Sequence, residues 1–174
     1  MVHRDSPKHT RSYRRGGIPQ QTTGKPILEP AGGGAADGTD HAAALGGRYV
    51  ETDVTDPEAA RRAVAAAAEA FGPVDILVNN AALYAPLDME RYDRIDPDLW
   101  DRVMAVNVRG AFNMVQAAGP MMEARGSGKI INITSGTVYR GMPNMLHYIT
   151  SKGALAAMTR ALSRELGPKG VCVN

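Results

Sequence analysis

The sequence has little of three things that would point to a specialised class of protein. It has one cysteine, Cys172, which excludes an internal disulfide framework and suits a reducing cytoplasm. No apolar run approaches the ~18 residues of a membrane span, and the basic start, residues 1–15, lacks the apolar core of a secretory signal. Net charge is only +2, so the overall balance predicts no strongly charged partner. We therefore expect a cytoplasmic protein without a membrane partner.

A nucleic-acid partner is the remaining alternative for the basic start. Residues 11–15, RSYRR, are basic, but no aromatic platform or nucleic-acid-binding fold accompanies them. A basic-tailed binding module would bind nucleic acid in a salt-sensitive way, and we do not favour it. We expect no nucleic-acid partner and no metal.

The chain divides into two unlike segments near residue 45. Residues 1–44 contain four branched aliphatic side chains, many glycines and prolines, and no periodicity of 2 or 3.6. Such a stretch buries too little apolar surface to offset the entropy lost on ordering. We predict that residues 1–44 are low in complexity and mostly disordered, with at most a short strand, and that residues 45–174 form the folded domain.

Strand and helix patterns alternate through the second segment. Apolar or β-rich runs predict strands, longer amphipathic or apolar stretches predict helices, and the order indicates a parallel α/β sheet. The strands are expected at 48–54, 74–80, 128–135 and 171–174, and the helices at 55–72, 97–126 and 146–167. The fold class is a Rossmann-like, doubly wound parallel sheet.

Helix boundaries are marked by residues with known end preferences. Thr55 or Asp56 caps the first helix, Pro57 lies in its first turn, and Gly72 ends it. The long helix that follows Asp96 is apolar on most sides, which is typical of a buried or interface helix.

Four residues combine polar chemistry with suggestive positions. Ser135 lies at the carboxyl end of a predicted strand, the edge where ligands of open α/β sheets bind. Tyr148 follows it, and Lys152 lies one helical turn later on the same face. Asn107 lies within the apolar helix upstream. Each alone has an ordinary structural reading as a packing residue, a helix polar group or a strand-end cap.

Together these residues resemble the short-chain dehydrogenase/reductase family over about residues 46–174. The combination of Asn107, Ser135 and Tyr148-x-x-x-Lys152, with NNA at the end of the strand upstream, carries the resemblance. It implies that Tyr148 is the catalytic acid/base and that Ser135 hydrogen-bonds the substrate oxygen. It also implies that Asn107 holds a water on the proton path to Lys152, which in turn contacts the nicotinamide ribose.

The resemblance also implies a chemical reason for the Tyr148–Lys152 pair. A free phenol has a pKa near 10, too high for a good base at neutral pH. The Lys152 ammonium and an oxidised nicotinamide would both favour the phenolate. The neighbouring His147 points away from Tyr148 by helical geometry, so we expect it at a surface or interface. Met142, Met145 and Leu146 either line a substrate pocket or belong to the local core.

Further residues are expected to contact the dinucleotide, either NAD or NADP. The resemblance assigns Asp53 to the adenine amino group and places Val54, Asn80 and Ala81 at the cofactor site with Tyr148 and Lys152. The run NNAA, residues 79–82, has Ala82 where the family has glycine, a small departure. Asn80 is expected to have a structural hydrogen-bonding role.

The family's first strand and its glycine-rich phosphate turn are not recognisable. Residues 22–30 have one Thr-Gly pair without the later glycines, and the glycines of 32–38 follow no apolar strand. In the sheet order 3-2-1-4-5-6, this absence leaves strand 74–80 with an open edge. The family's segment after 171–174 is also not recognisable. We therefore expect a fragment, or a misframed copy, of a complete enzyme.

Two functions remain open for the chain. The first is NAD(P)-dependent interconversion of a secondary alcohol and a ketone, as in 3-oxoacyl-carrier-protein reductases and secondary-alcohol dehydrogenases. The alternative is a non-catalytic remnant that at most associates with intact subunits. Helices 97–125 and 146–167 resemble those through which the family forms homodimers and homotetramers.

Overall fold

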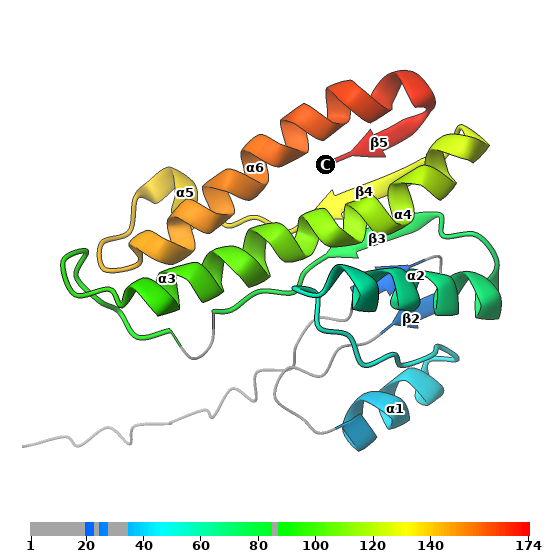
Figure 1. The fold of residues 1–174 in the computed structure, drawn as a ribbon, viewed down its shortest axis with the longest axis horizontal. Coiled ribbons are helices and arrows are strands. Elements are labelled where there is room, and N and C mark those ends of the chain that lie inside the picture. Colours follow the sequence, from blue (N-terminus) through cyan, green and yellow to red (C-terminus); the bar gives the residue numbers. More distant parts are fainter. Residues whose placement is uncertain (1–19, 23–24, 28–34, 85–86) are drawn as a thin grey trace, which may run out of the picture.

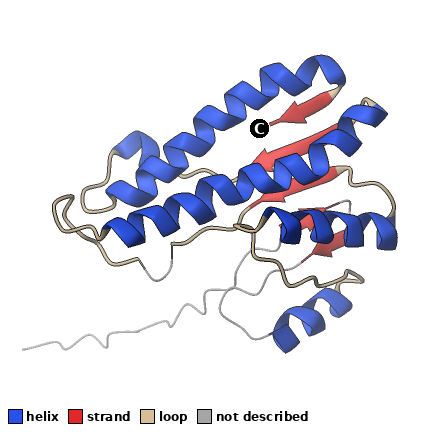
Figure 2. Cartoon of the chain, in the orientation of Figure 1, coloured by secondary structure: helices blue, strands red, loops and turns tan. Residues whose placement is uncertain are grey.

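A mixed sheet with helices along one face forms the described part of the chain (Figure 1, Figure 2). The structure, a computed structural model, describes residues 20–22, 25–27, 35–84 and 87–174, with side chains from residue 38 onward. Helices α2 (Pro57–Phe71), α4 (Ala111–Arg125) and α6 (Leu146–Leu166) lie in front of the strands in Figure 1.

The described sheet has the order β2-β1-β3-β4-β5. Strands β3 (Ile76–Asn79), β4 (Gly128–Asn132) and β5 (Val171–Val173) are parallel, with Leu77 opposite Ile130. Helices connect them, as parallel strands require. The predicted α/β class, the three strands and an incomplete parallel sheet are confirmed.

A short hairpin lies at the edge of β3 that we expected to be open. Strands β1 (Gln20–Thr22) and β2 (Lys25–Ile27) pair antiparallel, and Thr22 of β1 pairs antiparallel with Leu77 of β3. The prediction of an open edge is therefore wrong, because this hairpin satisfies part of the β3 backbone.

The structure describes only part of the predicted disordered segment. It places β1, β2 and an unpredicted helix, α1 (Ala35–Ala44), there. Residues 1–19, 23–24 and 28–34 lie outside the described residues. The division of the chain at residues 44 and 45 stays a prediction.

The predicted strand at 48–54 is wrong, because this segment is irregular. No strand of the described sheet pairs with it. Side chains bind its carbonyl groups instead: the Thr52 hydroxyl donates to the Val50 carbonyl at 3.0 Å, and Asn113 Nδ2 donates to the Val54 carbonyl at 2.9 Å. A β-rich composition alone does not make a strand when no neighbouring backbone is available.

Helix α2 begins and ends at the residues that the sequence indicated. The Asp56 carboxylate accepts the Glu58 amide at 2.9 Å, Pro57 is the first helical residue, and Gly72 follows the helix with φ of 87°. Small buried side chains such as Ala60 and Ala67 face the core and allow close packing against α4.

The long predicted helix is confirmed, but its middle is a π-helix. Helix α3 (Pro97–Met104) continues through η1 (Ala105–Gly110) into α4. Such π segments are rare and often occur at functional sites. This one contains Asn107, whose side chain points into the interior with 1% exposure.

The strands are buried on one face of the sheet only. Ile130 on β4 is fully buried, whereas its neighbour Ile131 is 36% exposed, and Cys172 on β5 is exposed between two buried valines. The reason is that the helices packed against β4 and β5, namely α4 and α6, lie on one face. Among the described residues, no helix combines the length and apolarity that crossing a membrane requires.

Candidate functional site

The N-terminal turns of helix α6 carry the predicted tyrosine and lysine close together. Tyr148 is 8% exposed and Lys152 is 2% exposed. Lys152 Nζ lies 5.8 Å from the centre of the Tyr148 ring. Lys152 Nζ also donates a hydrogen bond to the Ile133 carbonyl at 2.7 Å, which ties α6 to the chain just after β4. The shared face predicted from the i, i+4 spacing is therefore present.

Burial governs the protonation of both groups. It lowers the pKa of Lys152 to about 8, because an ammonium loses hydration in this position. Burial is also the largest influence on Tyr148 and raises the pKa of its phenol; a hydrogen bond with Ser135 opposes this, and repulsion from Tyr84 adds to it. The expected lowering of the Tyr148 pKa by Lys152 together with an oxidised nicotinamide stays a prediction.

Ser135 lies three residues after the end of β4, at the edge of the sheet where the parallel strands end. Its Oγ accepts hydrogen bonds from the Thr137 amide at 3.2 Å and from Thr137 Oγ1 at 2.8 Å. These bonds hold Ser135 at the start of α5 (Thr137–Arg140), an unpredicted helical turn. Because the hydroxyl also reaches Tyr148, the structure brings Ser135, Tyr148 and Lys152 to one place.

Asn107 connects the π-helix to the loop after β3. Its Oδ1 accepts the Leu83 amide at 2.7 Å, and its Nδ2 donates to the Leu83 carbonyl at 3.4 Å. Nδ2 also donates to Ser151 Oγ at 3.0 Å. The side-chain amide of Asn107 therefore holds protein groups. Its expected part in a water-mediated proton path stays a prediction.

Ser151 is a site residue that the sequence reasoning missed. It is fully buried, and its Oγ donates to the Tyr148 carbonyl at 2.7 Å while accepting from Asn107 Nδ2. Ser151 thus joins the helix of Tyr148 to the π-helix of Asn107. The signal was available in the sequence, because Ser151 lies three residues after Tyr148 and therefore near its face of the helix.

Two of the predicted cofactor residues upstream lie close together. Val54 and Ala81 border a narrow hollow together with Gly110, and a side chain at Gly110 would meet Val54 Cγ2 at 2.6 Å. Asp53 is exposed, and its Oδ1 accepts both the Thr55 amide and the Thr55 hydroxyl at 2.8 Å. Val54 and Ala81 therefore lie together, whereas the Asp53 carboxylate supports the turn before α2.

Asn79, next to the predicted Asn80, has structural hydrogen bonds that the sequence reasoning did not anticipate, and the expected role of Asn80 stays a prediction. Asn79 Nδ2 donates to Asn132 Oδ1 at 2.9 Å, and Asn132 Nδ2 donates to Thr159 Oγ1 at 2.8 Å. This chain of polar groups links β3, β4 and α6 beneath the site. Asn80 is half-buried.

His147 is not at a surface or interface as predicted. Its side chain is fully buried, and Nδ1 accepts the Tyr148 amide at 2.9 Å. The helical angle between neighbours correctly separates His147 from Tyr148, but both directions lead into packed regions. Met145 is also buried, whereas Leu146 is 46% exposed.

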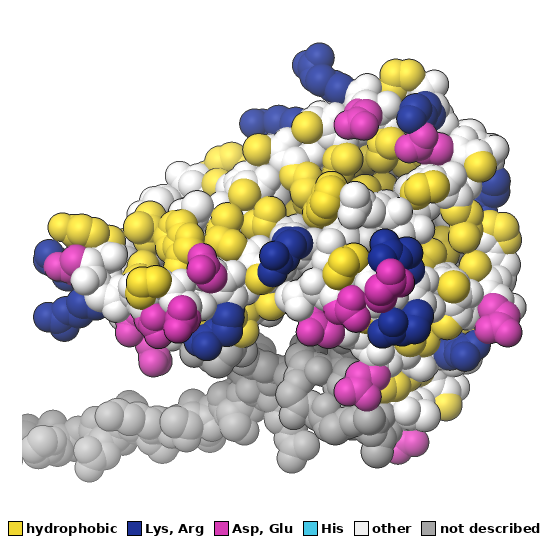
Figure 3. Space-filling view, viewed as in Figure 1, with side chains coloured by type: hydrophobic (Ala, Val, Ile, Leu, Met, Phe, Trp, Pro, Cys, Tyr) yellow, Lys and Arg dark blue, Asp and Glu magenta, His cyan; other side chains and the backbone are white. Residues whose placement is uncertain are grey.

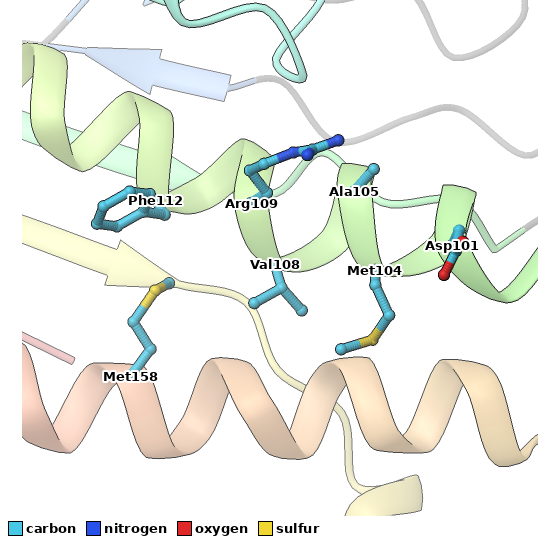
Figure 4. A pocket seen from close by; sticks show the side chains of 7 residues that line it. All are labelled: Asp101, Met104, Ala105, Val108, Arg109, Phe112 and Met158. Atoms are coloured by element: carbon cyan, nitrogen blue, oxygen red, sulfur yellow. The ribbon is translucent and has the colours of Figure 1, made fainter.

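An apolar groove runs between the long helix and α6 (Figure 4). Its volume is about 560 Å³, and it lies on the helices that we expected to mediate self-association. Met104, Val108, Phe112 and Met158 provide its apolar lining, with Asp101 and Arg109 also at its edge in Figure 4. Figure 3 shows apolar side chains gathered along this part of the molecule.

Comparisons with known proteins agree with the fold. A family model described as enoyl-(acyl carrier protein) reductase matches residues 31–174. Galactitol 2-dehydrogenase of Cereibacter sphaeroides is 44% identical over 136 residues, which are 76% of this chain and 51% of that protein. Gluconate 5-dehydrogenase of Gluconobacter oxydans is 37% identical over 122 residues, 70% of this chain and 46% of that protein.

A solved structure extends the comparison to three dimensions. The 3-ketoacyl-(acyl-carrier-protein) reductase of Brucella melitensis complexed with NADH superimposes with a TM-score of 0.75 at 31% identity. The match covers 80% of this chain and 60% of that one. The partial parallel sheet and the helices packed on it place the chain in the Rossmann-like α/β class. The chain belongs to the short-chain dehydrogenase/reductase family. It spans about half the length of the curated relatives it matches.

Proposed function

We propose that this chain carries the catalytic residues of an NAD(P)-dependent oxidoreductase that interconverts a secondary alcohol and a ketone. The observation that carries the proposal is the convergence of Ser135, Tyr148 and Lys152 at the edge where the parallel strands end. Family membership and the NADH in the matched reductase structure support a nicotinamide cofactor.

The proposed chemistry assigns a separate task to each side chain. In alcohol oxidation, Tyr148 would take the hydroxyl proton as its phenolate, which the positive charge of an oxidised nicotinamide would favour against the effect of burial. Ser135 would donate a hydrogen bond to the substrate oxygen. The bound nicotinamide supplies the acceptor for the hydride that leaves the carbinol carbon. Lys152 retains donor capacity beyond its bond to Ile133, which fits a contact to the nicotinamide ribose.

Other residues near the site fit the proposal as supporting groups. Asn107 and Ser151 fix the helix segments that carry Tyr148. Asp53, Val54, Asn80 and Ala81 remain proposed contacts of the adenosine half, supported by the clustering of Val54 and Ala81. The single cysteine supports a reducing cytoplasmic setting.

A second candidate function is a non-catalytic remnant, and one observation favours it. On the side of β3 away from β4, the neighbouring strand is β1, which runs antiparallel to it. A parallel neighbour would end at the site's edge and lead into a phosphate-binding helix, whereas an antiparallel strand runs the other way. Such a remnant would associate with intact subunits through α3–α4 and α6. The groove between these helices also supports homodimer or homotetramer formation.

Dinucleotide binding separates the two functions. We would titrate the purified 174-residue chain with NADH and NADPH and follow nucleotide fluorescence, then screen secondary alcohols with the nucleotide that binds. Saturable binding with turnover is the expected result. A folded chain that binds neither nucleotide would leave the remnant as the better account.

A further inference from the structure

Tyr84 has no role in the proposed chemistry so far, and the Asn107 side chain holds the backbone next to it. It follows Leu83, whose amide and carbonyl are both bound by the Asn107 side chain. Asn107 is 1% exposed, so this attachment lies in the interior. The backbone leading to Tyr84 is therefore held against the π-helix.

The Tyr84 ring lies against the ring of Tyr148. The two ring centres are 4.8 Å apart, with their planes tilted by 45°, a favourable arrangement for aromatic pairs. Tyr148 is 8% exposed, but Tyr84 is 46% exposed. One side of Tyr84 thus packs on Tyr148 while nearly half of it remains accessible beside the phenol.

Two other exposed apolar side chains lie on the segments that contain Tyr84 and Tyr148. Met89 is 60% exposed and Leu146, two residues before Tyr148, is 46% exposed. The Glu90 amide donates to the Asn144 carbonyl at 2.9 Å, which joins the segment of Met89 to the segment that leads into α6. The segments that carry Tyr84 and Tyr148 thus expose further apolar side chains.

We propose that Tyr84 is a specificity-determining residue whose ring selects substrates with an apolar group beside the reacting carbinol. The inference rests on the proposed function, and it names the substrate class as aryl or alicyclic secondary alcohols rather than polyols. Moving an apolar group from water onto the ring face of Tyr84 lowers its free energy. A hydroxyl in the same place would lose its hydrogen bonds to water, with carbon surface opposite it.

Substrate selectivity tests the inference in the active chain. We would compare kcat/KM for 1-phenylethanol with kcat/KM for galactitol, using the nucleotide that binds. The expected preference is for 1-phenylethanol, and Tyr84→Ala should reduce the ratio by about tenfold, the scale on which an apolar pocket discriminates. Tyr84→Phe keeps the ring and should keep the ratio. Tyr139→Ala, which removes an 82%-exposed tyrosine on α5, is the surface control.

A binding measurement makes the test independent of turnover. Saturation-transfer NMR of 1-phenylethanol with the full chain should show contact in the wild type and in Tyr84→Phe, and lose it in Tyr84→Ala. If the NMR contacts follow this pattern but no alcohol is turned over, the proposed function is wrong and the Tyr84 inference still holds. Preference for galactitol, an unchanged ratio in Tyr84→Ala, or no contact with 1-phenylethanol in the wild type would overturn the inference.

Discussion

At the scale of single residues, Tyr148 carries the proposed proton transfer. Tyr148→Phe removes the hydroxyl and keeps the ring that packs on Tyr84. Loss of a general acid/base typically lowers turnover by about 10²–10⁴-fold. We expect turnover to be lost while dinucleotide affinity is nearly unchanged, measured by steady-state kinetics and fluorescence titration. Undiminished turnover would refute the acid/base role.

The burial of Lys152 predicts that the stability of the fold depends on pH. Its pKa is about 8 in the folded chain against an ordinary value of 10.5, so between these values the unfolded chain binds more protons. The contribution of Lys152 to the free energy of unfolding should therefore rise as pH rises from about 8 to 10.5. Lys152→Met removes the buried charge and should increase stability below pH 8 by up to roughly 3 kcal/mol.

Denaturant unfolding of both proteins across this pH range measures the effect. The difference between wild type and Lys152→Met should shrink as pH approaches 10.5. The exposed Lys129 on β4 gives the matched control, because Lys129→Met removes a lysine without changing a buried group. Equal pH dependence in wild type and Lys152→Met would contradict the assigned cause.

At the scale of elements, the end of the π-helix is fitted to the irregular segment 48–54. A Cβ added to Gly110 would meet Val54 Cγ2 at 2.6 Å, so Gly110→Ala should destabilise the fold by about 1–3 kcal/mol, as overpacking does. Val54→Ala removes the opposing methyl groups and should restore part of this loss in the double variant. Thermal unfolding of the single and double variants measures the coupling.

Gly119 provides the control for that prediction. It lies in the same long helix, and a Cβ there would meet no atom within 4 Å. Gly119→Ala should therefore cost less than Gly110→Ala, although Pro120, next in the chain, offsets the roughly 0.5–1 kcal/mol that alanine gains over glycine in a helix. Equal destabilisation at both positions would indicate a helix effect rather than contact with Val54.

Local sequence signals predicted elements where the deciding contacts are local. Asp56, Pro57 and Gly72 define helix α2 because caps act within one turn of the chain. Residues 48–54 misled the prediction because a strand depends on a neighbouring backbone that is distant in sequence. The π turn at Asn107 depends on Leu83, 24 positions away, so no local pattern indicates it.

In the candidate site too, the sequence predicted what depends on local spacing and not what depends on contacts between distant segments. The spacing of Tyr148 and Lys152 on one helix predicted their shared face, and the end of β4 predicted the position of Ser135. Tyr84 could not be predicted, because its contact with Tyr148 joins a loop to a helix through tertiary packing alone. His147 was misplaced for a related reason, since helical periodicity gives its direction but not what covers it.

At the scale of the whole molecule, the groove between the long helix and α6 predicts how copies of the chain associate. Phe112 lines this groove and is 43% exposed, an unusual state for a phenylalanine beside Val108 and Met158. Burying the ring against a second copy would remove this apolar surface from water. We therefore expect the wild type to sediment as a dimer or tetramer in analytical ultracentrifugation.

Phe112→Asp should convert that assembly to monomers. Most homo-oligomers have two-fold interfaces, which use the same patch twice, so one substitution would place two unpaired carboxylates in the contact. Burying unpaired charges outweighs the apolar gain that remains. Tyr139→Asp adds the same charge to an exposed aromatic position on α5, outside the groove, and should leave the assembly intact. If Phe112→Asp sediments as the wild type does, the groove is not the contact between copies; if only Phe112→Asp dissociates, the long helix and α6 form it.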